Sequence, residues 1–450
     1  MARLGERRTS RAPTRRKLQS AARIETDNTL TIERLSHDGR GIAHDADGKT
    51  VFVDRALPEE RVKAAVHRSH RRFDEAHVKQ LLSKSELRTM PRCIHFGVCG
   101  GCDVQHIDIE AQRHHKCSVL EEHFIRHQLS LPAIDLLAGH AYGYRRRARL
   151  GVKIDRNGQI HFGFRIRGSD RLFDIEQCPI LVPELERLLP ELRQHLEQLE
   201  APRRLGHIEL IASDNTCAVI VRQLKEVPRD TELWRSLAQR LGVSLIMIEG
   251  RDAPSLQPLE GEAVLHYRLE TTGHEPLILS FLPGDFLQVN AEINEALVEK
   301  ALAWSEVNAQ TEVIDLFAGI GNFTLPLAQR GARVTGIEGR QAMVERLLSN
   351  AQANGLDHVT ARQADLNHFP EGLSKASLIV LDPPRDGALA ICQGLAEHGP
   401  ARVLYVSCEP ATLARDAAAL VAGGYRISRA AVADMFPQTA HMESLLLFER

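Results

Sequence analysis

A cysteine stands at the tip of an apolar segment close to the carboxyl end of the sequence. Residues 403–407 read Val-Leu-Tyr-Val-Ser, and Cys408 follows them directly. A short apolar run of this kind is typical of a buried strand, and a thiol at its end is placed to act as a nucleophile. Because Leu381-Asp382-Pro383-Pro384-Arg385 and a glycine-rich segment precede it, the pattern predicts a methyl-transfer domain with covalent catalysis.

The glycine-rich segment predicts a loop that binds a nucleoside. Residues 313–317 predict a strand, after which Gly319 and Gly321 let the backbone approach a ligand at the start of the next helix. A second predicted strand ends at Glu338, about 20 residues further on, where a carboxylate can hold ribose hydroxyls. Asp365 follows the next apolar stretch and is placed to contact an adenine edge.

Two cofactors present an adenosine to such a sheet, a nicotinamide dinucleotide and S-adenosylmethionine. The strand end at Asp382-Pro383-Pro384 favours S-adenosylmethionine. The alternative for Glu338 and Asp365 is that both are solvated loop carboxylates. The order of the motifs along the chain favours a cofactor pocket.

Four of the eight cysteines have a spacing typical of ligands to an inorganic centre. Cys93, Cys99 and Cys102 form C-x5-C-x2-C, and the two glycines before Cys102 let the backbone fold tightly. Cys178 is the best candidate for a fourth ligand because Pro179 follows it, as in many iron-sulfur proteins. Four thiolates suit either tetrahedral zinc or an iron-sulfur cluster, so the spacing leaves both open. Buried structural thiols are the remaining alternative.

The pattern of strands and helices predicts several domains. Short apolar-polar alternations with Asp-Gly turns predict a β-barrel first, and mixed strands and helices follow. The last region alternates apolar strands with helical segments, which predicts a doubly wound parallel sheet of the Rossmann-like α/β class. The expected parts are a basic arm at 1–23, a barrel at 24–84, a mixed α+β central domain at 85–275, and a methyltransferase domain at 276–450.

Several basic segments are candidates for nucleic-acid contacts. Residues 67–72 read His-Arg-Ser-His-Arg-Arg in the predicted barrel, and aromatic residues interleave with arginines at 142–149 and 162–167. Stacking on bases and charge on phosphates would use that mixture. The alternative is a pair of half-buried strands whose arginines face water. The arm at 1–23 carries eight Arg or Lys residues against Glu6 alone, which fits either a solvated tail or a phosphate-binding segment.

The composition is that of a globular protein with a formal net charge of -2 over 450 residues. The sequence lacks a run of about 18 consecutive apolar residues, so we expect no membrane span. The eight cysteines are too sparse for a secreted disulfide framework. We therefore expect a cytoplasmic protein that does not bind membranes, and a monomer.

Five groups of residues, in this order, resemble the motifs of the RNA uracil-C5 methyltransferase family. They are Phe286–Asn290, Asp315–Phe323, Asp382–Arg385, Ser407–Pro410, and Asp434–Pro437 with His441–Glu443. The resemblance extends over nearly the whole chain. The presence of both a barrel and a cysteine cluster is similar to bacterial members that act on 23S ribosomal RNA.

The resemblance implies a set of functional features. The barrel would be a TRAM domain, and the four cysteines would hold a [4Fe-4S] cluster, which the spacing alone does not select over zinc. S-adenosylmethionine would be the methyl donor, and 23S ribosomal RNA with a flipped-out uridine would be the substrate. The expected pocket residues are Gln288, Phe317, Asn322, Glu338, Asp365 and Asp382.

The chemistry of uracil explains the two catalytic residues that the resemblance implies. C5 of uracil is a weak nucleophile, so Cys408 would first add to C6, and Glu443 would later remove the C5 proton. One departure from the family is Glu409, where Asn is common, because a second carboxylate beside the thiol would raise its pKa unless it is paired or points away. Asp365 also stands where Asn is seen. The alternatives are an RNA amino-group methyltransferase and a non-catalytic RNA-binding protein.

Overall fold

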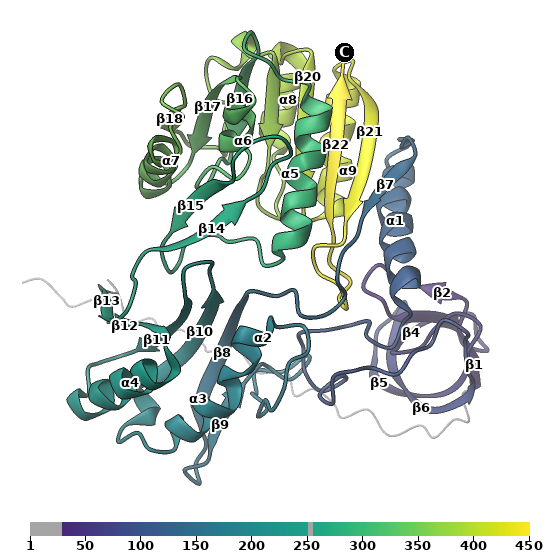
Figure 1. Ribbon diagram of the computed structural model, residues 1–450. Helices are drawn as coiled ribbons and strands as arrows, with labels where there is room; N and C mark the ends of the chain where they lie inside the picture. Colours follow the sequence, from purple (N-terminus) through teal and green to yellow (C-terminus); the bar gives the residue numbers. More distant parts are fainter. Residues whose placement is uncertain (1–28, 251–254) are drawn as a thin grey trace, which may run out of the picture.

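The computed structural model describes residues 29–250 and 255–450 of the chain, so the predicted basic arm at 1–23 lies outside the described residues. Figure 1 shows three parts, which are a barrel, a middle sheet with helices packed on it, and a C-terminal part with helices around a large sheet. None of the described helices is both long and apolar enough to cross a membrane.

The first part is a barrel made from a sheet of the order β1-β5-β6-β4-β3-β2 (Figure 1). Its strands are β1 Thr29–Thr31, β2 Arg34–Leu35, β3 Gly41–His44, β4 Thr50–Asp54, β5 Arg61–Ser69 and β6 Phe73–Ser83. Small and branched apolar residues such as Ile32, Val51 and Ala76 fill its interior. The long β5–β6 hairpin ends in a turn where Arg71 and Arg72 are exposed. The predicted barrel is confirmed.

The middle part is a second sheet, of the order β13-β12-β11-β10-β8-β9. Its strands are β8 Arg147–Ile154, β9 Ile160–Gly163, β10 Leu205–Ala212, β11 Cys217–Gln223, β12 Ser244–Glu249 and β13 Ser255–Glu260. The associated helices are α2 Pro183–Glu186, α3 Leu188–Leu196, the short 3₁₀ turn η1 Pro202–Arg204, and α4 Pro228–Leu241. Leu189 and Leu192 of α3 and Trp234 of α4 share one core with the sheet.

The C-terminal part has an eight-stranded sheet of the order β18-β17-β16-β19-β20-β22-β21-β7. Its strands are β7 Ile134–Leu137, β16 Glu312–Leu316, β17 Arg333–Glu338, β18 Thr360–Gln363, β19 Leu378–Leu381, β20 Arg402–Ser407, β21 Arg426–Ala433 and β22 Glu443–Glu449. The five strands from β18 to β20 are parallel, and β22 runs antiparallel to β20. This arrangement confirms the predicted Rossmann-like α/β class.

Helices cover both faces of this sheet (Figure 1). They are α1 Ile109–Arg126, α5 Ala291–Ser305, α6 Thr324–Gln329, α7 Gln341–Ala353, α8 Leu389–His398 and α9 Pro410–Ala422, and the turn η2 Leu373–Lys375 precedes β19. Successive side chains of β20 point to opposite faces, so Leu404 and Val406 enter one core while Val403 and Tyr405 enter the other. Burial on both faces explains the continuous apolar run before Cys408.

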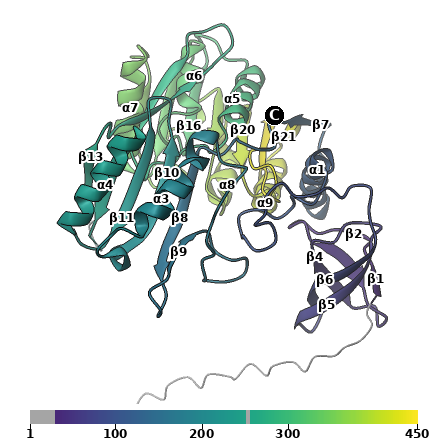
Figure 2. The ribbon, with the colours of Figure 1, turned by 60° about the horizontal axis from the view of Figure 1, so that its bottom comes forward.

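The segment between the barrel and the middle sheet contributes to the C-terminal part. Strand β7 pairs in parallel with β21, and Val119, Leu120 and Phe124 of α1 pack in the same core as α8 and α9. Figure 2 shows α1 beside α9, with the barrel standing next to it. Strands β14 Leu265–Leu269 and β15 Leu277–Phe281 form a hairpin that packs on the core beneath α5. The domain boundary at residue 275 stays a prediction. Two elements before it, β7 and α1, pack with the eight-stranded sheet.

Candidate active site

The predicted site residues gather at the carboxyl edge of the eight-stranded sheet. Leu381 of β19 lies between Leu316 of β16 and Tyr405 of β20 in the parallel register. The carboxyl ends of these neighbouring strands therefore meet at one edge. Glu338 ends β17 at the same edge, and the residues that follow the other strands include Phe317, Asp382 and Cys408.

Cys408 and Glu443 come from neighbouring strands that run in opposite directions. Ser407, the last residue of β20, is the register partner of Ser444 in β22. The residue after Ser407 and the residue before Ser444 are then the next pair across the two strands, so Cys408 and Glu443 stand side by side. Cys408 is half-buried and Glu443 is buried. A thiol and a carboxylate are thus held at one point of the edge.

The surroundings of Cys408 disfavour its thiolate. Burial raises the pKa of the Cys408 thiol to about 11, and the carboxylate of Glu443 adds to the increase. The guanidinium of Arg385, from the Asp382–Arg385 motif, acts in the opposite direction. The thiol is therefore mostly neutral at pH 7 in the ligand-free protein.

Three carboxyl groups at this edge also have raised pKa values. Burial raises the pKa of Asp382 to about 7, with repulsion from Asp315 as the further cause. Burial likewise raises the pKa of Asp315 to about 7, although Thr324 donates a hydrogen bond of 2.5 Å to it. Burial, and then Asp382, raise the pKa of Glu443 well above its usual range, while Arg385 opposes them. Perturbed carboxyl groups clustered at one edge are typical of a catalytic site.

Glu409 caps helix α9. It is the N-cap residue of α9, and its carboxylate accepts a hydrogen bond from the backbone N–H of Ala411 at 3.4 Å. The main causes of the raised Cys408 pKa are burial, Glu443 and Asp382. The carboxylate of Glu409 therefore stands at the N-terminus of α9, where a negative charge is favourable.

A cavity of about 510 Å³ lies at the ends of β16, β17 and β18, on the same edge of the sheet. Its lining includes three of the predicted pocket residues, Phe317, Glu338 and Asp365. The Glu338 carboxylate accepts hydrogen bonds from the backbone N–H groups of Gly319 and Arg340, both at 3.1 Å. Asp365 accepts bonds from Asn367, which lower its pKa.

The backbone of the loop after β16 is unusual and shapes the mouth of this cavity. Phe317 has a φ of 64°, which non-glycine residues rarely adopt. Gly321 has a φ of 108°, and a Cβ atom there would come within 2.9 Å of the Leu325 side chain. Backbone strain of this kind concentrates at ligand sites.

The other predicted pocket residues lie outside the lining of this cavity. Asn322 exchanges two hydrogen bonds with Asn294 of α5, at 2.9 and 3.0 Å, and accepts a third from the Tyr267 hydroxyl at 3.1 Å. Gln288 is buried, and its carbonyl accepts a hydrogen bond of 2.8 Å from Arg146. Asn322 thus links the loop after β16 to α5 and β14, and the backbone of Gln288 links the segment before α5 to Arg146.

The arginines at 142–149 do not form one uniform surface. Arg146 is buried, and its guanidinium stacks 4.8 Å from the centroid of the Tyr267 ring. Arg147 pairs with the buried Glu209 at 2.8 Å, whereas Arg149 is mostly exposed. The expectation that these residues face RNA or water was wrong for Arg146, which is buried. Its side chain and its backbone N–H both donate to carbonyls of the 288–289 segment, at 2.8 and 2.9 Å.

Some site residues carry no strong signal in the sequence. Arg340, Gln363 and Asn367 line the cavity, yet polar residues after strands are common in loops. Arg385 belongs to the Asp382–Arg385 motif, but only the structure reveals that its charge acts on both Cys408 and Glu443.

The four cysteines of the predicted cluster influence one another. The pKa of Cys178 is raised to about 12 by burial and then by Cys102, Cys93 and Cys99. Burial also raises the pKa of Cys102 to about 12, and Cys99 and Cys93 contribute. Within residues 29–250 and 255–450, no three His, Cys, Asp or Glu side chains form a group that could hold a metal ion. The four thiols are therefore near enough to influence one another's pKa, but the described part of the chain does not hold them as a ready metal site.

The fold and the site together define a Rossmann-like methyltransferase in which a cysteine and a carboxylate stand side by side at the sheet edge. The family model for tRNA (Uracil-5-)-methyltransferase matches residues 108–377 and 362–450, and the TRAM domain model matches residues 28–79. The chain belongs to the tRNA (uracil-5-)-methyltransferase family, whose members use S-adenosylmethionine.

Curated relatives match over nearly their whole length. The chain is 54% identical to the 23S rRNA (uracil(1939)-C(5))-methyltransferase RlmD of Chromohalobacter salexigens, with 100% of this chain and 96% of that protein covered. It is 51% identical to the RlmD protein of Halomonas elongata, over 96% and 91% of the two chains. A crystal structure of Pyrococcus abyssi tRNA (uracil-54, C5)-methyltransferase with S-adenosyl-L-homocysteine has a TM-score of 0.74 at 22% identity, over 94% of this chain and 100% of that one. This last likeness bears on the fold alone.

Proposed function

We propose that this protein methylates C5 of a uridine in 23S ribosomal RNA, with S-adenosylmethionine as the methyl donor. The observation that carries the proposal is the register of β20 and β22, which makes Cys408 and Glu443 neighbours beside the Asp382 motif. The names of the two relatives above 50% identity support the choice of 23S rRNA.

In this proposal Cys408 is the nucleophile. As its thiol gives up the proton to solvent, Sγ forms a bond to C6 of the uracil, and the electron pair of the C5–C6 double bond moves onto C5 and O4. Bound S-adenosylmethionine supplies the methyl group, which C5 takes as the S–CH3 bond breaks. The pKa of about 11 means that the proton leaves Cys408 only as the attack proceeds.

Glu443 is the general base that completes the reaction. It removes the proton from C5, the C5–C6 double bond forms again, and the C6–Sγ bond breaks with its electron pair returned to sulfur. Burial keeps Glu443 near the thiol and away from water. The guanidinium of Arg385 favours the ionised carboxylate that this step requires.

The cofactor pocket is the cavity lined by Phe317, Glu338 and Asp365. The carboxylates of Glu338 and Asp365 suit the hydrogen-bond donors of an adenosine. Gln288, Asn322 and Asp382 would complete it around the reacting groups. Tyr267 and Asn294 hold the side chain of Asn322, which preorganises it for this role. Arg146 holds the backbone of Gln288 through its carbonyl.

The RNA would be held by the barrel and by exposed arginines such as Arg71, Arg72 and Arg149. A thiol cannot reach C6 of a stacked base, so the target uridine would be flipped out of its helix or loop. We propose a monomeric, cytoplasmic enzyme, since these contacts need one chain only.

The four cysteines would hold a [4Fe-4S] cluster. The C-x5-C-x2-C spacing and the mutual electrostatic influence of the thiols support this set. Cluster binding would have to draw the four sulfurs together, because the described part of the chain does not hold them as a ready metal site. The backbone N–H of Gly101 donates to Cys99 Sγ at 3.3 Å, a contact that stabilises a ligand sulfur. Iron and sulfide analysis of protein purified without oxygen tests this assignment, and Cys102→Ser should lose both elements.

The test of the function is analysis of nucleosides after incubation with S-adenosylmethionine and 23S rRNA. The proposal predicts 5-methyluridine at one position, and none with Cys408→Ala. An RNA amino-group methyltransferase would instead yield a base methylated on its exocyclic nitrogen, without need of Cys408 or Glu443. A non-catalytic RNA-binding protein would leave the RNA unmodified.

A further inference from the structure

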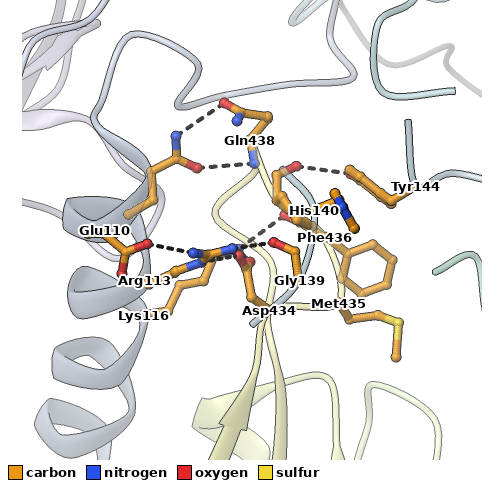
Figure 3. A network of polar contacts seen from close by, with 12 residues as sticks. Glu110, Arg113, Lys116, Gly139, His140, Tyr144, Asp434, Met435, Phe436 and Gln438 are labelled. Atoms are coloured by element: carbon orange, nitrogen blue, oxygen red, sulfur yellow. Dashed lines mark hydrogen bonds and ion pairs between the residues drawn. The ribbon is translucent and has the colours of Figure 1, made fainter. Parts of the chain in front are cut away.

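The hairpin loop 434–442 ends directly at Glu443, and contacts from distant parts of the chain hold it in place. Ala433 and Glu443 are register partners, so they are the pair that closes the β21–β22 hairpin. The loop therefore leads directly into the backbone of Glu443, and its position affects where the Glu443 side chain is placed. Figure 3 shows the polar network around this loop.

At the start of the loop, helix α1 supplies two cations to one carboxylate. Asp434 is fully buried, and its two oxygens accept from Lys116 Nζ at 2.6 Å and from Arg113 Nε at 3.2 Å. The side chains of Lys116 and Asp434 are each only 1% exposed. A buried ion pair of this kind gains little net stability, and it holds groups in one arrangement because a displaced charge would be left unpaired.

Four consecutive carbonyls of the loop each accept a hydrogen bond from another element, as buried backbone acceptors require. The donors are Asn290 Nδ2 to Met435 at 3.4 Å, Lys116 Nζ to Phe436 at 3.0 Å, Tyr144 Oη to Pro437 at 2.9 Å, and the backbone amides of Asp103 and Val104 to Gln438 at 3.1 and 3.2 Å. The donors come from α1, from the chain before β8, from the start of α5, and from the segment directly after Cys102. The loop is thus fixed from several sides.

The Gln438 end of the loop is held by a matched amide pair. Gln112 Oε1 accepts from the Gln438 backbone N–H at 3.1 Å, and Gln112 Nε2 donates to Gln438 Oε1 at 3.1 Å (Figure 3). Gln438 has a φ of 70°, an uncommon conformation for a residue with a side chain. The pairing with Gln112 is therefore needed to keep the chain turned at this point.

We propose that Tyr144, Lys116 and Gln112 are positioning residues for Glu443, and that they act on release of the methylated product rather than on methyl transfer. The inference rests on the proposed function, in which Glu443 acts only after the methyl group has moved. Displacement of the loop would shift the carboxylate relative to C5 and leave Cys408 in place, because β20 belongs to the parallel core of the sheet.

Tyr144→Phe is the sharpest variant because it removes one hydroxyl and keeps the buried ring. Tyr425→Phe is a matched control, since Tyr425 is also buried and its hydroxyl donates to a proline carbonyl, Pro400, at 2.6 Å. Rapid-quench measurements with the full-length protein, 23S rRNA and S-adenosylmethionine would follow methyl transfer and decay of the covalent methylated adduct separately. Glu443→Gln provides the reference for blocked release.

For Tyr144→Phe we expect release to slow by roughly three- to tenfold with methyl transfer nearly unchanged, since small displacements of a reacting group cost such factors. Tyr425→Phe should alter neither step. Lys116→Met should slow release more, and its melting temperature reports whether it folds; if it does not, Tyr144→Phe alone decides. If Glu443→Gln accumulates the adduct while Tyr144→Phe behaves like Tyr425→Phe, the inference is overturned. If Glu443→Gln itself releases product normally, the proposed role of the base fails instead.

Discussion

The protonation state of Cys408 offers a prediction that can be worked out from the structure. Burial and the neighbouring Glu443 raise the thiol pKa from 9.0 to about 11. A difference of about two units reduces the thiolate fraction at neutral pH about a hundredfold relative to an ordinary cysteine. Only the thiolate reacts with iodoacetamide, but a more basic thiolate is a stronger nucleophile. Cys408 in the ligand-free protein should therefore be alkylated roughly ten times more slowly than a small exposed thiol at pH 7.

The assay is mass spectrometry of the peptide that contains Cys408 after timed alkylation across a range of pH. The rate should rise about tenfold for each pH unit from neutral pH to about pH 10, because the pKa lies above that range. Arg385→Gln removes the charge that favours the thiolate, so it should slow alkylation further. A rate that levels off below pH 9 would refute the idea that burial and Glu443 keep this thiol neutral.

Three further outcomes are expected. Glu443→Gln should transfer the methyl group and then accumulate the covalent adduct, seen as an RNA–protein band that survives denaturation. Glu338→Gln should weaken binding of S-adenosylmethionine by roughly tenfold in calorimetry, since it removes a charged acceptor at the cavity. The folded-state pKa of Asp315 is raised to about 7 from 3.8, so its contribution to stability is present below pH 4 and is lost as the pH rises through 7. Urea unfolding at pH 5 and pH 8 should therefore show a smaller decrease for Asp315→Asn than for the unchanged protein, by about 2.7 kcal/mol, because this interval covers about two units of the pKa shift; equal decreases would contradict it.

The parts of the fold that follow from local pattern could be predicted from the sequence. The apolar run before Cys408 predicted a buried strand, and the structure shows that Leu404 and Tyr405 enter different cores on its two faces. The Asp-Gly turns and short alternating runs predicted the barrel. Such signals are local, because side-chain periodicity reports which faces of an element are buried.

Long-range arrangements left no comparable signal. The pairing of β7 with β21 joins segments almost 300 positions apart, and periodicity does not reveal a partner strand. The burial of Arg146 was missed for the same reason, since an arginine among aromatic residues is also typical of an RNA-facing strand. The proximity of Cys408 and Glu443 came from a family resemblance, and its physical basis is a register that only the structure supplies.

The central claim, covalent methylation at C5, is tested most directly by trapping. The protein would be mixed with S-adenosylmethionine and a 23S rRNA fragment in which 5-fluorouridine replaces uridine, and then analysed by mass spectrometry. Fluorine cannot leave as a proton does, so the account predicts a stable methylated RNA adduct on Cys408 and none with Cys408→Ala. Absence of the adduct from protein that binds both the RNA and S-adenosylmethionine would contradict the account.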